Sequence, residues 1–547
     1  MKKLSYLVVF ALCSRMVFPS FVAANPHTRS IPAHVGFITT SQSKGRSVPL
    51  GARISAEPAP KPFDEKLIRW IQANVSKETN MPLSFYIPAQ KRDQIFQEMG
   101  HADSVPSIIE RVIVDEGLIV YDGAVGQIVL SLLGGNDNFA LAAHPLKVYW
   151  DGQLGDLFNI RAGYPMNSFI YDPDDPYAVS SDLNDKGKRG FIFRIINANG
   201  RYNTSDPLDG KTHFDGFPTW PTVHWEDWKP VAGENAWVVM AALHLYHQKY
   251  YDPYRKMYPA TGQTVELLLA EEIARAALLL QAENGGIRMA PIGTFRNPTD
   301  FQDSSLKQGE WWYNQISSEN NISWYGAFGM LYEITQNSIY KDAMQGIEEY
   351  FKSVWDENEN YFYQGLNFCN GQWMANNEHF ALDVQTWGLA AFGPEKFDEW
   401  FGEGTAYRVW KNAKQLSGVY DSGKNLVGVG YIREHDRVSV EWTAGAILAA
   451  RLVGDHYRHD HPRWADESYA DADTMRQGIE FLRTDLGEDR AAYSYSSRRG
   501  WIPFGWNSHS PEVLSLASTG WVIFVDTGFN PFYLESRNNA KHYAKQR

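Results

Sequence analysis

Long apolar segments with helical spacing recur along most of this chain of 547 residues. Within each segment, apolar residues return every three or four positions, which predicts a helix with one buried face. The predicted helices span residues 63–75, 120–133, 138–149, 235–250, 265–283, 321–336, 339–355, 382–392, 406–416, 440–453, 472–486 and 513–525. A fold for this chain must bury an apolar face of all twelve.

Consecutive helices form five hairpins, and the first and last helices make a sixth. The apparent inner helices start near residues 121, 235, 321, 382, 440 and 513. This uneven spacing excludes a solenoid of short repeats. A closed ring of six hairpins is the compact arrangement that buries every apolar face. We therefore predict an all-α fold, an (α/α)6 toroid, with an open helical array as the alternative.

The exception to the helical pattern is residues 150–230, which are rich in Gly, Asp, Pro and aromatic residues. Residues 190–196 read as a strand, and long insertions in compact domains are usually functional loops. We expect a small β-containing insertion that forms a flap over one end of the ring. The predicted catalytic domain is 63–535, followed by a polar tail at 536–547.

The first 24 residues have the pattern of a signal peptide. Lys2 and Lys3 precede an apolar stretch, and Val22, Ala23 and Ala24 supply small residues for cleavage. A Ser- and Pro-rich flexible leader is expected at 25–62. The protein should then be periplasmic or secreted. No later segment has 18 uninterrupted apolar residues, so no membrane span is expected.

Composition narrows the possible partners. The formal net charge is −13, whereas nucleic-acid binding needs a basic face. Aromatic residues reach 14%, including 19 Trp, a content common in carbohydrate-active proteins and also in large aromatic cores. Without the signal peptide only Cys369 remains, so no disulfide or cysteine metal site can form. No nucleotide loop or convincing metal-ligand spacing is present, so we expect no cofactor.

Acidic residues stand at or near the starts of the predicted inner helices. They are Asp122, Glu319, Asp383 and Glu441. Asp122, Asp383 and Glu441 occur beside apolar residues, where a carboxylate must be paired, hydrogen-bonded or functional. In a toroid these helix starts meet at one end, and the helix dipoles there favour anionic groups. An acid of this kind, taken alone, is more often a helix cap or a member of an ion pair than a functional group.

Aromatic and amide side chains surround these acids in sequence. Flat rings suit the C–H faces of sugars, and amides suit sugar hydroxyls. The residues expected to bind substrate are Trp225, Asn235, Trp311, Trp312, Asn320, Tyr325, Gln385, Arg433 and Trp501. The run from His456 to His461 offers zinc ligands but reads better as a polar link between helices.

Four segments resemble the six-hairpin (α/α)6-barrel glycosidase superfamily, in particular a bacterial exported group. They are Ser318–Ile322, Leu382–Trp387, Val440–Gly445 and Gly528–Phe532. The resemblance spans about residues 63–535 and implies hydrolysis of a poly- or oligosaccharide by paired carboxylates, usually with inversion. Polysaccharide lyases and sugar epimerases share the toroid, so the fold alone does not fix the reaction.

Within this scheme Glu319 is expected to be the general acid, because it is the acid with the most aromatic neighbours in sequence and burial raises a carboxyl pKa. Asp383 is the expected base, Glu441 orients substrate or water, and Asp122 is the reserve. Two alternatives stay open. A lyase would draw on Tyr325, His379, Arg433 and His435, and a non-catalytic protein would bind glycans without cleaving them.

Overall fold

The computed structural model describes residues 63–99, 113–153, 168–169, 191–192, 194–198, 218–219, 223–227, 231–258, 264–290, 312–504 and 506–534. Contacts join Pro62–Arg547 into one compact unit. The predicted signal peptide, the leader, most of the 150–230 insertion, Trp311 and the polar tail lie outside the described residues. No described helix is long and apolar enough to cross a bilayer.

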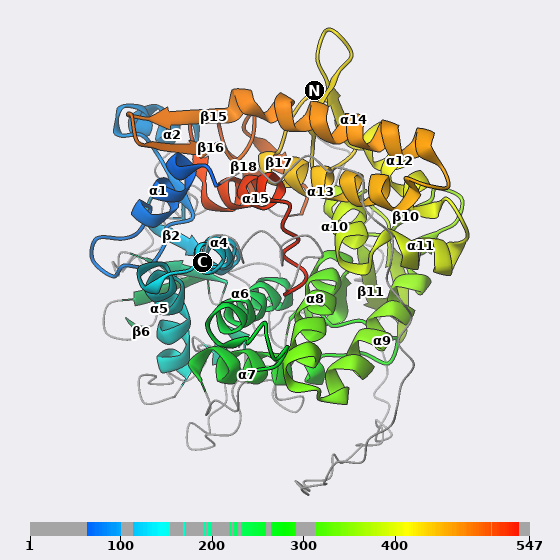
Figure 1. Ribbon diagram of the computed structural model, residues 1–547, viewed down its shortest axis with the longest axis horizontal. Helices are drawn as coiled ribbons and strands as arrows, with labels where there is room; N and C mark the ends of the chain where they lie inside the picture. Colours follow the sequence, from blue (N-terminus) through cyan, green and yellow to red (C-terminus); the bar gives the residue numbers. More distant parts are fainter. Residues whose placement is uncertain are drawn as a thin grey trace, which may run out of the picture. The chain divides into compact units, whose positions relative to one another are not determined.

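Six buried helices form a closed ring (Figure 1). Each packs against the next in chain order, and the last packs against the first, so the ring closes. The inner helices are α4 (Val120–Leu133), α6 (Ala232–Tyr250), α8 (Ser318–Thr335), α10 (Leu382–Phe392), α13 (Val440–Tyr457) and α15 (Leu516–Thr527).

An outer layer of helices covers this ring. Each outer helix packs on an inner helix next to it in the chain, except that α1 packs on α15 and closes the split hairpin. The outer helices are α1 (Glu65–Ala73), α5 (Asn136–Gln153), α7 (Val265–Leu279), α9 (Ser338–Ser353), α11 (Pro394–Phe401), α12 (Thr405–Ser417) and α14 (Pro462–Gly478). The predicted (α/α)6 toroid is therefore confirmed for the described residues.

One predicted helix has the wrong bounds, and two short helices have no predicted counterpart. The helix expected at 472–486 is α14, which begins at Pro462 and ends at Gly478; residues 479–486 are a 3-10 turn and strand β15 (Arg483–Leu486). Pro is well suited to the first helical position, where no N–H is needed. The short helices α11 and α2 (Arg92–Glu98) were not expected; α2 is mainly polar, and half of the residues of α11 are polar.

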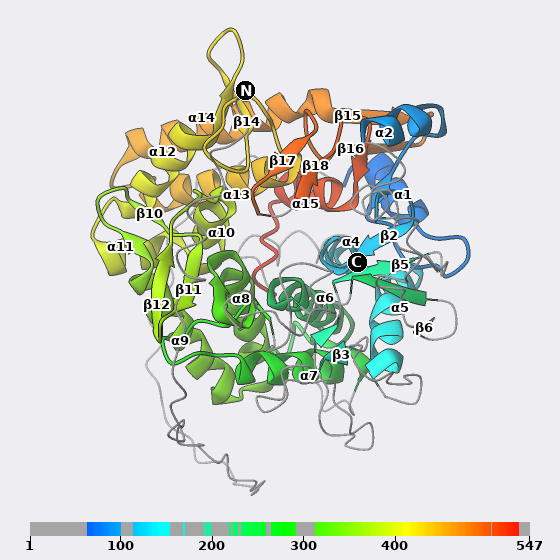
Figure 2. The ribbon, with the colours of Figure 1, turned by 180° about the vertical axis from the view of Figure 1, so that it is seen from behind.

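Short antiparallel strands lead into the inner helices, so the description "all-α" is incomplete (Figure 2). In the predicted insertion, β5 (Ile195–Asn197) pairs with β2 (Gly117–Ile119), which runs directly into α4. The described strands of the insertion thus include one anchored at the ring. The other pairings involve β8 (Gln315–Ser317), β11 (Gly365–Cys369) and β12 (Gln372–Asn376); β7 (Val223–Asp227) with β5 and β6 (Pro218–Thr219); β3 (Ser168–Phe169) and β4 (Phe191–Ile192); β1 (Phe85–Tyr86) and β19 (Leu514–Ser515); β9 (Trp355–Asp356) and β10 (Tyr361–Phe362); β13 (Gly418–Tyr420) and β14 (Leu426–Val429); β15 and β16 (Arg490–Tyr493); and β17 (Gly500–Ile502) and β18 (Trp506–Ser508).

A polar side chain four positions after the N-cap ties most inner helices to an extended segment. In α10, Gln385 accepts from the N–H of Phe362 at 2.9 Å and donates to its carbonyl at 2.9 Å. Asn235 makes the same pair of bonds with Ile192, both at 2.8 Å. Asn321, Thr443 and Thr519 occupy this position in α8, α13 and α15, and each binds backbone of a neighbouring segment. These side chains fix where each helix starts relative to the strands.

Tryptophans fill the centre of the ring. Trp237, Trp387 and Trp521 lie six positions after the N-caps of alternate inner helices, and the rings of Trp387 and Trp521 stack at 5.2 Å. The helices between them carry Val125, Ser323 and Gly445 at this position. A Cβ on Gly445 would lie 2.7 Å from Nε1 of Trp387, so this position requires glycine. We call these three rings the tryptophan layer.

The segment after α15 closes the end of the ring where the inner helices finish (Figure 1). Asn530 and Tyr533 donate to the carbonyls of Ala390 and Ala391 at the end of α10, at 2.9 and 2.5 Å. Phe532 packs against Trp237 with ring centroids 5.6 Å apart. We call this segment the plug. The N-terminal ends of the inner helices lie at the opposite end of the ring from the plug.

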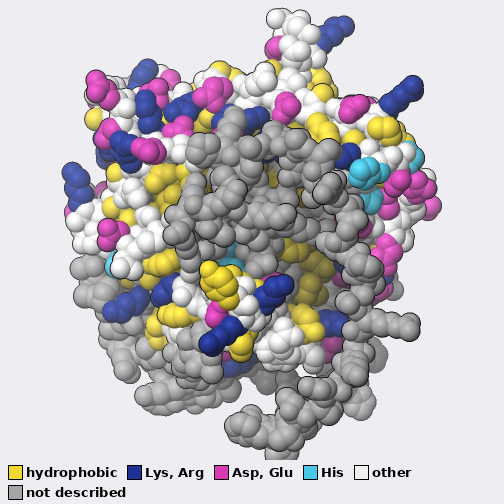
Figure 3. All heavy atoms as spheres, in the orientation of Figure 1, with side chains coloured by type: hydrophobic (Ala, Val, Ile, Leu, Met, Phe, Trp, Pro, Cys, Tyr) yellow, Lys and Arg dark blue, Asp and Glu magenta, His cyan; other side chains and the backbone are white. Residues whose placement is uncertain are grey.

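On the face seen in Figure 3, Lys and Arg side chains are interspersed with Asp and Glu along α14 and the upper edge. No broad basic patch stands out among the described residues of this face. The expectation that nucleic acid is not a partner stays a prediction.

The structure predicts that Gln385 is a stability residue. Replacing Gln385 with Leu leaves the N–H and C=O of Phe362 buried without partners, at a cost of about 1–3 kcal/mol for each group. The free energy of unfolding should fall accordingly in denaturant titrations, while Gln94→Leu on exposed α2 should change it little. A Gln385→Leu variant of wild-type stability would show that this clamp does not hold the strand.

Candidate active site

Three acids occupy equivalent positions on three consecutive inner helices. Glu319, Asp383 and Glu441 each lie two positions after the N-caps of α8, α10 and α13. The same position holds Ala517 in α15, Tyr121 in α4 and Gly233 in α6. At this position, three consecutive helices of the ring therefore carry an acid, and the other three carry two small residues and a tyrosine. We call these six positions the row.

Two further acids lie three positions after an N-cap, namely Asp122 in α4 and Glu234 in α6. Electrostatic interactions link Asp122 to Glu234 and to Glu441, and Glu319 to Asp383, Glu234 and Glu441. The four acids predicted from the sequence are thus brought together at the N-terminal end of the ring, where the helix dipoles favour negative charge.

Glu319 lies at the junction of α8 and α6. Its Oε1 accepts a hydrogen bond from Ser323 at 3.1 Å, and a Cβ on Gly233 would lie 3.3 Å from its Oε2. Burial raises the pKa of Glu319 well above its ordinary value, and the charges of Asp383 and Glu234 raise it further. Burial and these neighbouring charges therefore favour the protonated form of Glu319.

Asp383 is 7% exposed and accepts the N–H of Val384 at 2.8 Å. Burial raises the pKa of Asp383 to about 7; the Val384 hydrogen bond opposes this rise, and the charge of Glu441 adds to it. Asp383 therefore exchanges its proton near neutral pH, as a general base requires.

Glu441 is 4% exposed, and its Oε1 accepts a hydrogen bond from the hydroxyl of Tyr121 at 2.5 Å. Burial raises the pKa of Glu441 to about 8, and the Tyr121 hydrogen bond limits the rise. The same surroundings raise the pKa of Tyr121 well above its ordinary value, so its phenol stays neutral. Tyr121 in turn accepts from Nε1 of Trp521 at 2.8 Å.

Asp122 is 5% exposed, and its Oδ2 has no hydrogen-bond partner. Burial raises the pKa of Asp122 to about 7; a hydrogen bond from Ser84 opposes the rise, and the charge of Glu234 adds to it. Glu234 is paired with Arg194, whose Nε lies 3.2 Å from its Oε1. Asp122 is thus a buried acid held neutral over part of the physiological range.

Several residues expected to bind substrate have other contacts. The amides of Asn235 and Gln385 are fully buried and bonded to backbone, so they position strands rather than a sugar. Tyr325 donates to Glu348 of the outer helix α9 at 2.9 Å, on the outward side of α8. Trp312 packs in a small cluster with Val231 and Ala290.

Asn320 belongs to the α6–α8 contact beside Glu319. A Cβ on Gly233 would lie 2.2 Å from its Oδ1, and its Nδ2 is buried without a hydrogen-bond partner. Trp225 lies in β7, opposite Ile196 of β5. Of these two predicted residues, Asn320 is the one that the structure brings next to a carboxyl group of the site.

Arg433 and Trp501 lie in segments close to the starts of α10 and α13. Arg433 donates to the hydroxyl of Tyr361 at 3.1 Å. Trp501 is 61% exposed on β17. The turn of that hairpin reaches α13, because Phe504 stacks on Trp442 with ring centroids 6.2 Å apart. Trp501 is the exposed ring that this part of the structure offers for stacking.

The histidine run has partners in the outer layer. Nε2 of His456 lies 3.1 Å from Asp398, and Nε2 of His461 lies 2.8 Å from Glu403. Among the described residues, no three His, Cys, Asp or Glu side chains are grouped so as to hold a metal ion. The expectation that no cofactor is needed stays a prediction.

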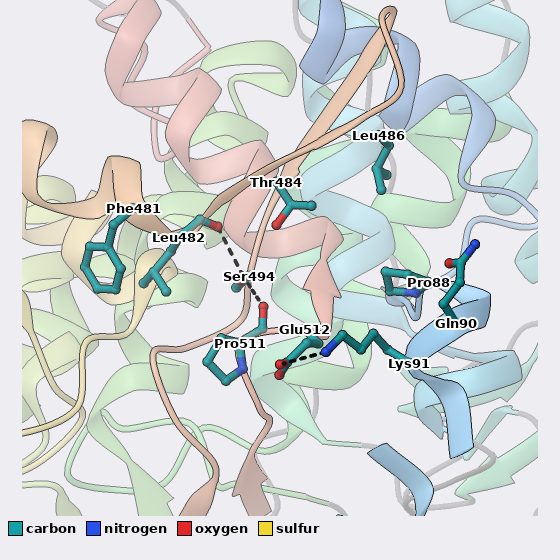
Figure 4. A pocket seen from close by; sticks show the side chains of 10 residues that line it. All are labelled: Pro88, Gln90, Lys91, Phe481, Leu482, Thr484, Leu486, Ser494, Pro511 and Glu512. Carbon is teal, nitrogen blue, oxygen red and sulfur yellow. Dashed lines mark hydrogen bonds and ion pairs between the residues drawn. The ribbon is translucent and has the colours of Figure 1, made fainter. Parts of the chain in front are cut away.

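A pocket of about 430 Å³ lies away from these acids, between η2 (Ala89–Lys91) and the β15–β16 hairpin (Figure 4). Leucines, prolines and Phe481 line most of it, and Lys91 and Glu512 form an ion pair at 3.9 Å. It contains none of the residues predicted to form the site.

Sequence reasoning did not find Tyr121, Ser323, Trp237, Trp521 or Gly233. All of them stand at fixed distances from the inner-helix N-caps. Aligning the six helix starts on their N-caps would have revealed these positions, but the predicted starts differed from the observed ones by up to three residues.

No protein family and no curated protein matches this sequence. Among solved structures, a sugar epimerase from a ruminal bacterium is similar with a TM-score of 0.48 and 10% identity, over 85% of this chain and 97% of that one. Cellobiose 2-epimerase from Spirochaeta thermophila gives 0.48 and 13%, over 85% and 94%. A family 76 glycoside hydrolase (mannosidase) from Bacteroides thetaiotaomicron gives 0.41 and 9%, over 85% and 96%. These structures include both epimerases and a hydrolase, so the likeness leaves the reaction open.

Proposed function

We propose that this protein is an exported glycoside hydrolase that acts on a poly- or oligosaccharide. The observation that carries the proposal is that the three carboxyl groups of the row, Glu319, Asp383 and Glu441, lie on consecutive inner helices with pKa values raised by burial. Glycoside hydrolysis needs one protonated and one ionised carboxyl group on either side of the scissile bond. The signal-peptide pattern of the first 24 residues supports export.

Glu319 is the proposed general acid, because burial and the charges of neighbouring acids raise its pKa and favour the protonated form. Asp383 is the proposed base that activates water, since its pKa of about 7 lets it ionise there. Inverting enzymes hold their two carboxyls about 6.5–9.5 Å apart to admit a water molecule, and retaining enzymes hold them about 5 Å apart. We propose inversion, the outcome that the resemblance of the four sequence segments implies.

Glu441 is proposed to orient the substrate or the attacking water, and Asp122 remains the reserve carboxyl. A neutral sugar suits this group better than a uronate, because several buried carboxyl groups interact here and the nearby Arg194 and Arg437 are already paired with Glu234 and Glu434. An anionic ring would add charge to an acidic end of the ring.

A lyase mechanism fits these contacts less well. A lyase needs a base that removes a proton beside a uronate carboxylate, and the raised pKa of Tyr121 makes its phenol a donor instead. Tyr325, the tyrosine considered for this role from the sequence, is bonded to Glu348 in the outer layer. The surroundings of the carboxyl groups therefore favour hydrolysis.

Activity is tested by incubating the protein with a broad panel of neutral and uronate-containing polysaccharides and measuring new reducing ends. Glu319→Gln and Asp383→Asn should each lower kcat by about 10²–10⁴-fold, the usual contribution of a general acid or base, with KM nearly unchanged. Glu349→Gln, on the exposed side of α9, is the matched control. An ultraviolet-absorbing unsaturated product would identify a lyase, an epimerised sugar an epimerase, and binding without any new product a glycan-binding protein.

The raised pKa values also predict how stability depends on pH. A carboxyl group whose pKa is higher in the folded protein than in the unfolded chain destabilises the folded protein as pH rises. This loss of stability develops between the pKa in the unfolded chain, near 4, and the pKa in the folded protein. With folded values of about 7 for Asp122 and Asp383 and about 8 for Glu441, thermal stability should fall between pH 4 and pH 8. Glu441→Gln should make the fall shallower; an unchanged slope would mean that Glu441 ionises normally.

A further inference from the structure

Two tryptophans of the central layer donate, through a hydroxyl group, to two of the three carboxyl groups. In the first chain of hydrogen bonds, Nε1 of Trp237 donates to Oγ of Ser323 at 3.0 Å, and Ser323 donates to Oε1 of Glu319 at 3.1 Å. An indole N–H can only donate. The single hydroxyl proton of Ser323 is therefore directed at Glu319.

The second chain has the same order with a different hydroxyl. Nε1 of Trp521 donates to the phenol oxygen of Tyr121 at 2.8 Å, and Tyr121 donates to Oε1 of Glu441 at 2.5 Å. Tyr121 belongs to α4 and Glu441 belongs to α13, and α15 lies between these two helices in the ring. Ala517 occupies the equivalent position of α15, and its small side chain leaves space for the tyrosine to reach across.

The ring of Tyr121 is held on both sides by the tryptophan layer. Its centroid lies 5.0 Å from that of Trp237 in an edge-to-face contact and 6.2 Å from that of Trp387. Tyr121 is partly buried against the core, and these ring contacts limit the freedom of its hydroxyl to turn away from Glu441. The indole donor and the carboxylate acceptor fix the direction of its proton.

We propose that each of these two chains of hydrogen bonds has one fixed direction, from the tryptophan through the hydroxyl group to the carboxyl group, and we call each of them a relay. A relay holds Oε1 of Glu319 or of Glu441 as an acceptor, so that the exchangeable proton of that carboxyl group resides on Oε2. Ser323 and Tyr121 are then positioning residues. This inference rests on the proposed function for its catalytic meaning, whereas the relay itself is a property of the folded protein.

The relay assigns the catalytic oxygen of the general acid. With Oε1 of Glu319 accepting from Ser323, the proton leaves from Oε2, beside Gly233. A side chain at Gly233 would collide with Asn320 and crowd Oε2, because its Cβ would lie 2.2 Å from one and 3.3 Å from the other. The glycosidic oxygen is thus expected at Oε2, on the α6 side of Glu319.

Asp383 has no such relay. The tryptophan of its own helix, Trp387, faces Gly445 across the ring, and its Nε1 is buried without a hydrogen-bond partner. Asp383 accepts from the N–H of Val384 instead. Asp383 is therefore held as an acceptor by a backbone N–H of its own helix and not by a hydroxyl group of the described residues that a tryptophan orients.

The relay is tested by the pH dependence of thermal unfolding in a double-mutant cycle of Tyr121→Phe and Glu441→Gln. The Tyr121 hydrogen bond is stronger when Glu441 is ionised, because bonds to charged groups are roughly twice as strong. Tyr121→Phe should therefore lower the unfolding temperature more at pH 9 than at pH 6. In the Glu441→Gln background this difference between the two pH values should disappear.

Tyr363→Phe is the matched control, since Tyr363 donates to Asp356 at 2.9 Å, and hydrogen bonds from Tyr363 and from backbone N–H groups hold the pKa of that carboxyl group below its ordinary value. Its effect should be the same at both pH values and in both backgrounds. A Tyr121→Phe effect that is equal at pH 6 and pH 9, or that persists unchanged in Glu441→Gln, would overturn the relay.

Ser323→Ala supplies a second, independent arm if a Glu441 variant does not fold. Loss of the accepted hydrogen bond should raise the pKa of Glu319, so the alkaline limb of kcat/KM should move up by about one pH unit, while Ser468→Ala in α14 should leave it in place. An unmoved limb would overturn the Glu319 relay. The unfolding arm needs no substrate, so a protein that cleaves no glycan would refute the proposed function and leave the relay standing.

Discussion

Closure of the inner ring is the constraint on which the rest of this structure depends. Each inner helix is covered by two ring neighbours, an outer helix and the side chains of the centre, so almost none of its surface meets water. Backbone groups of a helix are satisfied internally except in its first and last turns. Polar chemistry can therefore be placed only at helix ends, and the plug after α15 occupies one end of the ring.

Burial of carboxyl groups at the remaining end links stability to chemistry. Glu319, Asp383 and Glu441 are held where ionisation is unfavourable, which is the condition that gives a carboxylic acid a pKa useful near neutral pH. Helix N-termini and hydroxyl donors offset part of this penalty. These buried carboxyl groups thus make the folded protein less stable than apolar residues at the same positions would. Burial of the large apolar core around them offsets this loss of stability.

Much of the fold could be predicted from the sequence, because helices buried on every side are continuous apolar runs and are easy to recognise. The error at α14 has the opposite cause: its residues are mostly polar, and its start is marked only by Pro462. The acids of the site could be predicted because carboxylates among apolar residues are conspicuous. Asn235 and Gln385 misled for the same reason, since an amide that binds backbone looks in sequence like one that binds a sugar.

Alternation of size in the tryptophan layer limits how such a ring can change. Large rings on α6, α10 and α15 face Ser, Gly and Val on α8, α13 and α4, so the six hairpins behave as three pairs. Duplicating or deleting a single hairpin would place two tryptophans, or two small residues, side by side. That would produce either a collision or a cavity at the axis. Only the gain or loss of two adjacent hairpins together would preserve the alternation. Rearrangements of this ring are therefore expected to occur in units of two hairpins.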